Sequence, residues 1–163
     1  MAETTENQAA AAPFRVAFVL MPRFSMLPFS AGLEPLRMAN RQSERALYSW
    51  QILSLDGAPT AASNGILVNA DSAIGDADPA DLYLVCGGEQ GHAAPDKRLA
   101  SWLRKLAQRK VSLGALCTGT YALAQADLLD GYRCTVHWEN IASLREQNLS
   151  LLGHHVSRHL ITR

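Results

Sequence analysis

The chain has 163 residues, 48% of them hydrophobic, and its 15 basic side chains balance 15 acidic ones. This length supports one substantial hydrophobic core, so we expect a single domain. The balanced charge excludes a domain that holds phosphate backbones through an overall positive surface. No apolar run approaches the roughly 18 to 20 residues that span a bilayer, and residues 1–13 lack a secretory signal pattern. We therefore expect a cytoplasmic protein without membrane contact.

The cysteines indicate free thiols. Cys86, Cys117 and Cys134 form an odd number without paired spacing, which favours neither a disulfide framework nor a zinc cluster. Three histidines between residues 154 and 159 have no cysteine or carboxylate partners at metal-ligand spacing. We therefore predict no metal and no cofactor, and interpret Cys86 and Cys134 as packing thiols.

The first third of the chain predicts a strand followed by a helix. Residues 1–12 have the composition of a disordered tail, and residues 14–21 form an apolar run typical of a strand buried on both faces. A helix is expected around residues 29–42. Pro35 lies inside it and disfavours helical geometry at Glu34, which predicts a helix start or a kink there.

The middle of the chain predicts a second strand, a hairpin and a third strand. Residues 49–57 form the second strand, and the Asn-Gly pair within residues 63–68 predicts a tight hairpin turn. Residues 81–88 form a further buried strand that ends in Gly87 and Gly88. Two glycines in this position indicate that the backbone approaches another group closely.

A basic amphipathic helix is predicted at residues 96–110. Its apolar side chains recur at helical spacing and its basic ones take the other faces, which is typical of a membrane-surface or partner helix, or more simply of a helix packed on a sheet. The remaining predicted elements are a strand at 110–117, a helix at 118–129, a turn with a short extended piece at 130–137, a helix at 137–147 and a strand at 154–161.

Alternating strands and helices predict a mostly parallel sheet with helices on both faces. In such sheets, functional sites lie beyond the carboxyl ends of the strands. Three candidates fall at that edge: the Gly87-Gly88 pair, Cys117, and the segment after the first strand that carries Glu34.

Cys117 is predicted to occupy a sharp turn between a strand and a helix. The positive end of the helix favours the thiolate, which is the nucleophilic form. The backbone amides of Thr118 and Gly88 would then form an anion-binding pair near the sulfur. The alternative is a small buried cysteine that only packs. A nucleophile also needs a proton partner, for which His137 is the best candidate, although His137 has an equally good interpretation as a capping or packing residue.

Two segments resemble a known family. The stretch GALCTGTYALAQADLLDGYRCTVHW resembles the nucleophile-elbow region of the PfpI branch of the class I glutamine amidotransferase-like superfamily. The stretch FSMLPFSAGLEPLRMANR resembles the first-helix region of the sensor domains of AraC/GlxA-type transcriptional regulators, whose members control arginine, carnitine and glycine betaine catabolism. The resemblance implies a flavodoxin-like α/β sandwich, here over residues 13–163.

The resemblance also implies roles for individual residues. Cys117 would be the elbow residue, and Glu34 the acidic residue near its sulfur, protonated and hydrogen-bonded to it. His137 would be the histidine found near the elbow in many members. Residues around the elbow would line the ligand pocket: Gly87, Gly88, Thr118, Gly119, Trp138 and Phe29. Of these, Trp138 or Phe29 would offer an aromatic face to a cation.

Two departures from the family pattern bear on function. Pro28 stands where isonitrile hydratases of this branch carry an aspartate, which argues against hydratase chemistry. Family regulators continue into a helix-turn-helix region, so we interpret the chain as a domain incomplete at its C-terminus whose DNA contacts lie elsewhere. We expect a homodimeric sensor of a small metabolite, such as an amino-acid derivative or quaternary amine. The alternative is a cysteine-dependent enzyme, isonitrile hydratase-like or amidohydrolase-like.

Overall fold

The computed structural model describes residues 12–89 and 96–132, and these form an α/β sandwich around one parallel sheet. The strands are β1 (Phe14–Leu20), β2 (Tyr48–Ser54), β3 (Thr60–Ala61), β4 (Leu67–Val68), β5 (Ser72–Ala73), β6 (Leu82–Cys86) and β7 (Ser112–Leu116). The helices are α1 (Met26–Ser43), α2 (Lys97–Gln108) and α3 (Thr120–Gln125), and the short 3-10 turn η1 (Cys117–Gly119) leads into α3.

The sheet has the strand order β5-β2-β1-β6-β7, and every pairing within it is parallel. The chain builds outward from β1 to β2 and then crosses to the other side of β1 for β6. The strand order therefore reverses between β1 and β6, and the carboxyl ends at such a reversal are where open α/β sheets bind ligands.

The register brings three strand ends level with one another. Leu20 of β1 lies beside Cys86 of β6, and Cys86 lies beside Leu116 of β7. The residues that follow these strands therefore emerge at one edge of the sheet. The predicted grouping of Gly87, Gly88 and Cys117 at that edge is confirmed.

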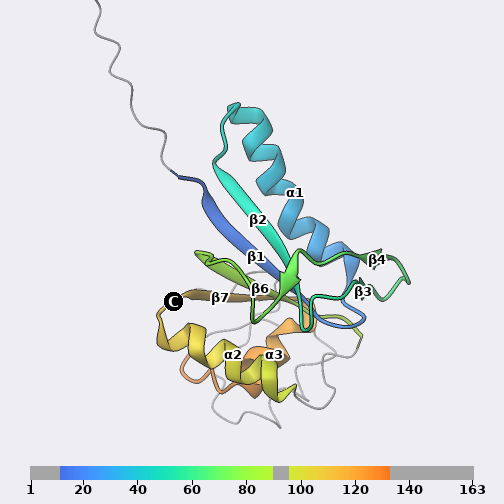
Figure 1. Ribbon diagram of the computed structural model, residues 1–163, viewed down its shortest axis with the longest axis vertical. Coiled ribbons are helices and arrows are strands. Elements are labelled where there is room, and N and C mark those ends of the chain that lie inside the picture. Colours follow the sequence, from blue (N-terminus) through green and yellow to red (C-terminus); the bar gives the residue numbers. More distant parts are fainter. Residues whose placement is uncertain (1–11, 90–95, 133–163) are drawn as a thin grey trace, which may run out of the picture.

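Helices cover both faces of the sheet, as the sequence predicted (Figure 1). The face under α1 holds an aromatic cluster in which Phe29 packs edge-to-face on Phe18 and on Phe24, with ring centroids 5.5 and 5.6 Å apart. The other face is covered by α2 and α3. Its buried α2 residues are Leu99, Ala100, Leu103 and Leu106.

The packing of α2 distinguishes a membrane-surface or partner helix from a helix packed on the sheet. Its apolar stripe is buried in the core, which confirms a helix packed on the sheet. Arg104 on its outer side donates hydrogen bonds to the Ala126 carbonyl and the Asp127 carboxylate, and so ties α2 to the end of α3. Among the described residues, no helix has the combined length and apolar character needed to cross a membrane.

Two local predictions need correction. Pro35 lies inside α1, which runs from Met26 to Ser43, so the helix does not start at Glu34, while the alternative of a kink there stays a prediction. Pro35 and Ala31 are both exposed, so water can bind the Ala31 carbonyl that Pro35 leaves without a donor. The helix predicted to reach residue 129 ends at Gln125, because the chain turns at Asp127 with φ 57°.

The predicted Asn-Gly hairpin is confirmed. Strands β3 and β4 pair antiparallel, and Gly65 takes φ 85° in the turn between them, where its N–H donates to the Ala62 carbonyl. The expected tail, the helix at 137–147, the strand at 154–161 and the residues Cys134, His137 and Trp138 lie wholly or largely outside the described residues.

Candidate functional site

Cys117 forms the turn between β7 and α3. Its backbone takes φ 55°, a left-handed conformation that non-glycine residues adopt rarely. Such outliers persist where the surrounding structure holds them, often at functional sites. Its side chain is partly exposed, which agrees with the predicted elbow and not with a cysteine walled into apolar packing.

Three chain segments meet beside this elbow. The loop between β1 and α1 binds the end of β6 through backbone hydrogen bonds from Met21 N–H to the Cys86 carbonyl and from Ser25 N–H to the Gly87 carbonyl, at 3.0 and 2.9 Å. The end of β6 in turn binds the elbow, because Gly87 N–H donates to the Leu116 carbonyl at 3.1 Å. The candidate site is therefore a continuous backbone structure drawn from three strand ends.

Thr118 locks the elbow to the end of β6. Its hydroxyl donates a 2.6 Å hydrogen bond to the Gly88 carbonyl, and its side chain is buried. The Gly88 N–H has no hydrogen-bond acceptor within the described ranges. This amide is therefore available to serve as one of the two anion donors expected from the sequence.

Glycine is required at three positions of this site. A Cβ on Gly88 would lie 2.0 Å from the Arg23 carbonyl oxygen, and a Cβ on Gly119 would lie 2.0 Å from the Val85 carbonyl oxygen. A Cβ on Gly87 would lie 2.2 Å from the Gly119 nitrogen. These close approaches explain why two glycines directly follow the buried strand β6.

The two described cysteines differ in environment. Cys86 is 1% exposed, and burial, together with the nearby Cys117, raises the pKa of its thiol. Its sulfur contacts the Leu84 carbonyl at 3.6 Å. Cys86 is therefore a packing thiol, as predicted, and the partly exposed Cys117 is the accessible one of the two.

Comparison with known proteins identifies this arrangement. Residues 15–162 match the DJ-1/PfpI family. The chain belongs to the DJ-1/PfpI family. It is 46% identical over 129 residues to the HTH-type transcriptional regulator CdhR of Pseudomonas aeruginosa, a match that covers 79% of this chain and 38% of the regulator. It is 41% identical over 134 residues to the HTH-type transcriptional regulator GbdR of the same species, covering 82% of this chain and 36% of GbdR.

A solved structure gives the same result. The chain is similar to an AraC family transcriptional regulator from Pseudomonas putida, with 32% identity and a TM-score of 0.75, covering 85% of this chain and 75% of that one. The predicted resemblance to a sensor-type domain of AraC-type regulators is thus confirmed at the level of family and relatives. The chain spans little more than a third of the length of the two curated regulators.

Glu34 of this DJ-1/PfpI domain does not have the predicted bond to sulfur. Its carboxylate accepts a 2.8 Å hydrogen bond from Arg37 Nε and forms an ion pair with the same guanidinium. The hydrogen bond and charge of Arg37 lower the pKa of Glu34, so the side chain is ionised and not protonated. The prediction of a protonated Glu34 hydrogen-bonded to Cys117 is wrong.

The rotation of α1 explains this error. Phe29, Leu33 and Leu36 pack toward the sheet. At 100° per residue, Glu34 lies about 140° around the helix from Phe29. Glu34 consequently faces solvent, with its side chain 51% exposed.

Phe29 belongs to the core and not to a ligand surface. It is 7% exposed and lies between Phe18 and Phe24. The expectation that it offers an aromatic face to a cation is not met by this packing. His137 and Trp138, the other predicted side chains near the elbow, lie outside the described residues.

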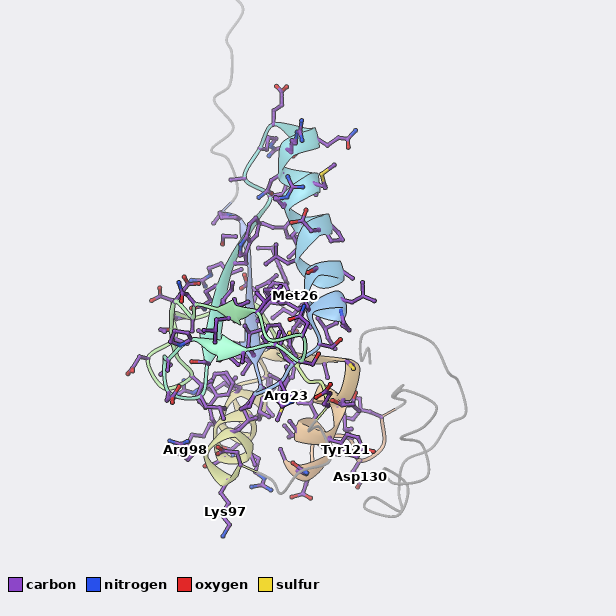
Figure 2. The ribbon with its side chains drawn as sticks, turned by 90° about the vertical axis from the view of Figure 1, so that its right-hand side faces the viewer. Arg23, Met26, Lys97, Arg98, Tyr121 and Asp130 are labelled. Atoms are coloured by element: carbon purple, nitrogen blue, oxygen red, sulfur yellow. The ribbon has the colours of Figure 1, made fainter. Side chains whose placement is uncertain are left out.

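One pair of side chains at the site was not expected from the sequence. Arg23, in the loop after β1 and labelled in Figure 2, binds the carboxylate of Glu89, which comes just after the glycine pair that follows β6. Both residues follow the ends of neighbouring strands, which is the signal that could have found them. In residues 12–89 and 96–132, no group of three or more His, Cys, Asp or Glu side chains could hold a metal ion.

Proposed function

We propose that this domain is the ligand-sensing part of a transcriptional regulator and binds a small metabolite at the Cys117 elbow. The observation that carries the proposal is the intact elbow, with Cys117 at φ 55° beside Gly88, in a chain 46% identical to an HTH-type regulator. The metabolite class expected from the sequence is an amino-acid derivative or a quaternary amine. DNA binding would belong to a helix-turn-helix domain of the regulator.

The surroundings of Cys117 favour binding over catalysis. A nucleophilic cysteine needs a neighbouring group that accepts or donates a proton. Glu34, the acidic residue expected next to the sulfur, is instead bound to Arg37 on the outer side of α1. Within the described part of the chain, no side-chain carboxylate hydrogen-bonds to the Cys117 thiol. A cysteine-dependent enzyme would therefore depend on His137, and it remains the second candidate.

The connection between the site and the rest of the domain supports signalling. The loop that contacts Gly87 and Gly88 leads directly into α1, which begins at Met26. A ligand that binds one arrangement of loop and elbow more tightly than another would shift the population of α1 positions. In the homodimer that we propose for the full regulator, such a shift would alter the spacing of the DNA-binding domains.

Isothermal titration calorimetry tests this proposal. Glycine betaine, carnitine and arginine are titrated into the wild-type chain, Gly88→Ala and Gly75→Ala. We expect saturable binding of at least one compound, weakened at least tenfold in Gly88→Ala, whose Cβ would displace the loop, and unchanged in Gly75→Ala, whose Cβ meets no atom within 4 Å. Binding should survive in Cys117→Ser. Absence of binding by all three, or turnover of an isonitrile that is lost in Cys117→Ser, would contradict sensing.

A further inference from the structure

Arg23 lies in the loop whose backbone contacts Gly88 and Glu89, and its side chain is paired with the Glu89 carboxylate. Its Nε donates a 2.8 Å hydrogen bond to Glu89 Oε2, and its Nη2 binds the same oxygen. We propose that Arg23 is the carboxylate-binding residue of the elbow site, and that Glu89 occupies it until a ligand carboxylate takes its place. This inference rests on the proposed function and names the chemical class of the ligand.

The backbone of Arg23 is fixed firmly. It takes φ 56°, its N–H donates to the Ala61 carbonyl at 2.9 Å, and its carbonyl accepts from Glu89 N–H at 3.3 Å. The next residue, Phe24, bridges Gly88 on one side and Ala62 on the other. A backbone held at both sides fixes where the side chain starts, and the bonds to Glu89 hold its charged group, which is the kind of support a binding residue requires.

Arg23 is contiguous with the elbow. Its carbonyl oxygen lies against the Gly88 Cα, where a Cβ would come within 2.0 Å of it. The Gly88 carbonyl accepts the hydrogen bond from Thr118, the residue after Cys117. The same residue, Gly88, therefore contacts both the Arg23 backbone and Thr118 of the elbow. Figure 2 shows Arg23 at a level between Met26 at the start of α1 and Tyr121 in α3.

The Arg23–Glu89 pair can be opened by a ligand. The side chains are 45% and 56% exposed, and ion pairs of such exposure contribute little to stability. Both hydrogen bonds of the pair end on a single Glu89 oxygen, whereas a guanidinium offers five donors that match two carboxylate oxygens. A ligand carboxylate that also reaches the Gly88 N–H, which has no acceptor among residues 12–89 and 96–132, would satisfy donors that Glu89 leaves unused. After such an exchange the guanidinium would still be paired with a carboxylate.

A second arginine–carboxylate ion pair, formed from β1 itself, provides a matched control. Arg15, near the start of β1, pairs with Asp81 just before β6, with side chains 52% and 43% exposed. It is thus an arginine pair of similar exposure that joins the same two parts of the sheet at its opposite edge. Arg15→Gln removes a comparable charge from the protein without touching the elbow.

Calorimetry with matched compounds tests the inference. The probes are glycine betaine with choline, and arginine with agmatine, in which the second member of each pair lacks the carboxylate. We expect the carboxylate member of one pair to bind and its counterpart to bind at least tenfold more weakly. Arg23→Gln should weaken the carboxylate member at least tenfold, Arg23→Lys should weaken it less, and Arg15→Gln should leave it unchanged. Glu89→Gln should strengthen it severalfold, because the internal competitor is removed.

The outcomes separate this inference from the proposed function. Equal binding of a compound to the wild-type chain and to Arg23→Gln would overturn the carboxylate role and leave the sensor proposal standing, provided that thermal melting shows both proteins to be folded. Equal binding of both members of a pair would do the same, as would weaker binding to Glu89→Gln. If no probe binds the wild-type chain, the proposed function fails and the inference fails with it.

Discussion

The hydroxyl of Thr118 donates a 2.6 Å hydrogen bond to the carbonyl oxygen of Gly88, 30 positions earlier in the chain. This bond joins the turn that carries Cys117 to the end of the neighbouring strand. Since Thr118 is buried, the Gly88 carbonyl would not readily find a water molecule in its place. Together with the backbone bond from Gly87 N–H to the Leu116 carbonyl, this side chain therefore sets the position of the elbow relative to Gly88.

Thr118→Val tests that dependence. Valine has nearly the same shape as threonine but cannot donate, so a buried carbonyl is left without a partner, at a cost of about 1–3 kcal/mol in the free energy of unfolding. Urea unfolding measures this loss. Thr118→Ser retains the donor and should be closer to wild type. Equal stability of the valine and wild-type chains would mean that the bond contributes nothing net.

Gly88→Ala tests the close approach of the β1–α1 loop to the end of β6. Its Cβ would lie 2.0 Å from the Arg23 oxygen, so the loop must shift, which we expect to cost about 1–3 kcal/mol. Gly75→Ala is the matched control, because nothing lies within 4 Å of its Cβ. That variant should range from unchanged to about 1 kcal/mol more stable. A Gly88→Ala protein as stable as the Gly75→Ala protein would contradict the close approach of these two segments.

The reactivity of the cysteines provides a third prediction. Burial raises the pKa of Cys86, so its thiol stays protonated and inaccessible as the pH rises, whereas Cys117 is partly exposed. In the folded protein, iodoacetamide should alkylate Cys117 at least about tenfold faster than Cys86. Raising the pH from about 7 to about 9 should not bring Cys86 into reaction. Peptide mapping by mass spectrometry separates the two sites, and both should react in urea. Comparable native rates would show that Cys86 is accessible.

The positions of Cys117 and Gly88 could be predicted from sequence because they depend on where strands end. Each follows an apolar run, and in a parallel sheet such runs finish at the same edge. The structure confirms this through the register that aligns Leu20, Cys86 and Leu116. Helix faces that bury apolar residues were predictable for the same reason, as the stripe of α2 shows.

The contacts of Glu34 and Arg23 depend on information that such patterns lack. A motif gives the position of Glu34 in the chain, but the direction of its side chain follows from where α1 begins and which face packs on the sheet. Pro35 suggested a boundary that tertiary packing overrides. The Arg23–Glu89 pair joins residues 66 positions apart, so it depends on the geometry of two loops. Cys117 itself shows that a left-handed backbone need not carry glycine.

Glu34→Gln tests the corrected position of this carboxylate. Glu34 is ionised, exposed and paired with Arg37, so its charge should not act on the elbow thiol. The rate of Cys117 alkylation between about pH 6 and about pH 9 should therefore be the same in wild type and variant. A protonated Glu34 at the sulfur would instead shift this profile on substitution. A shift that Arg37→Gln does not reproduce would restore the role that the resemblance implied.

Asp96 caps the N-terminus of α2, the helix that covers the face of the sheet opposite α1. Its carboxylate accepts hydrogen bonds from Arg98 N–H and Leu99 N–H, at 2.8 and 3.1 Å. Asp96→Ala should therefore lower the free energy of unfolding by about 0.5–2 kcal/mol near pH 7. Asp96→Asn keeps an acceptor oxygen without the charge and should lose less.

The pH dependence of this loss follows from the pKa of Asp96. Burial alone would raise the pKa, but the hydrogen bonds from Leu99 and Arg98 and the charge of Arg98 outweigh it and lower the pKa. A folded-state pKa below the unfolded value of about 4 means that the ionised form stabilises the protein above that pH, and that this contribution is lost as the pH falls through the folded value. In urea unfolding from about pH 7 to about pH 3, the difference between wild type and Asp96→Asn should shrink. A constant difference would show that the charge of Asp96 does not contribute to the cap.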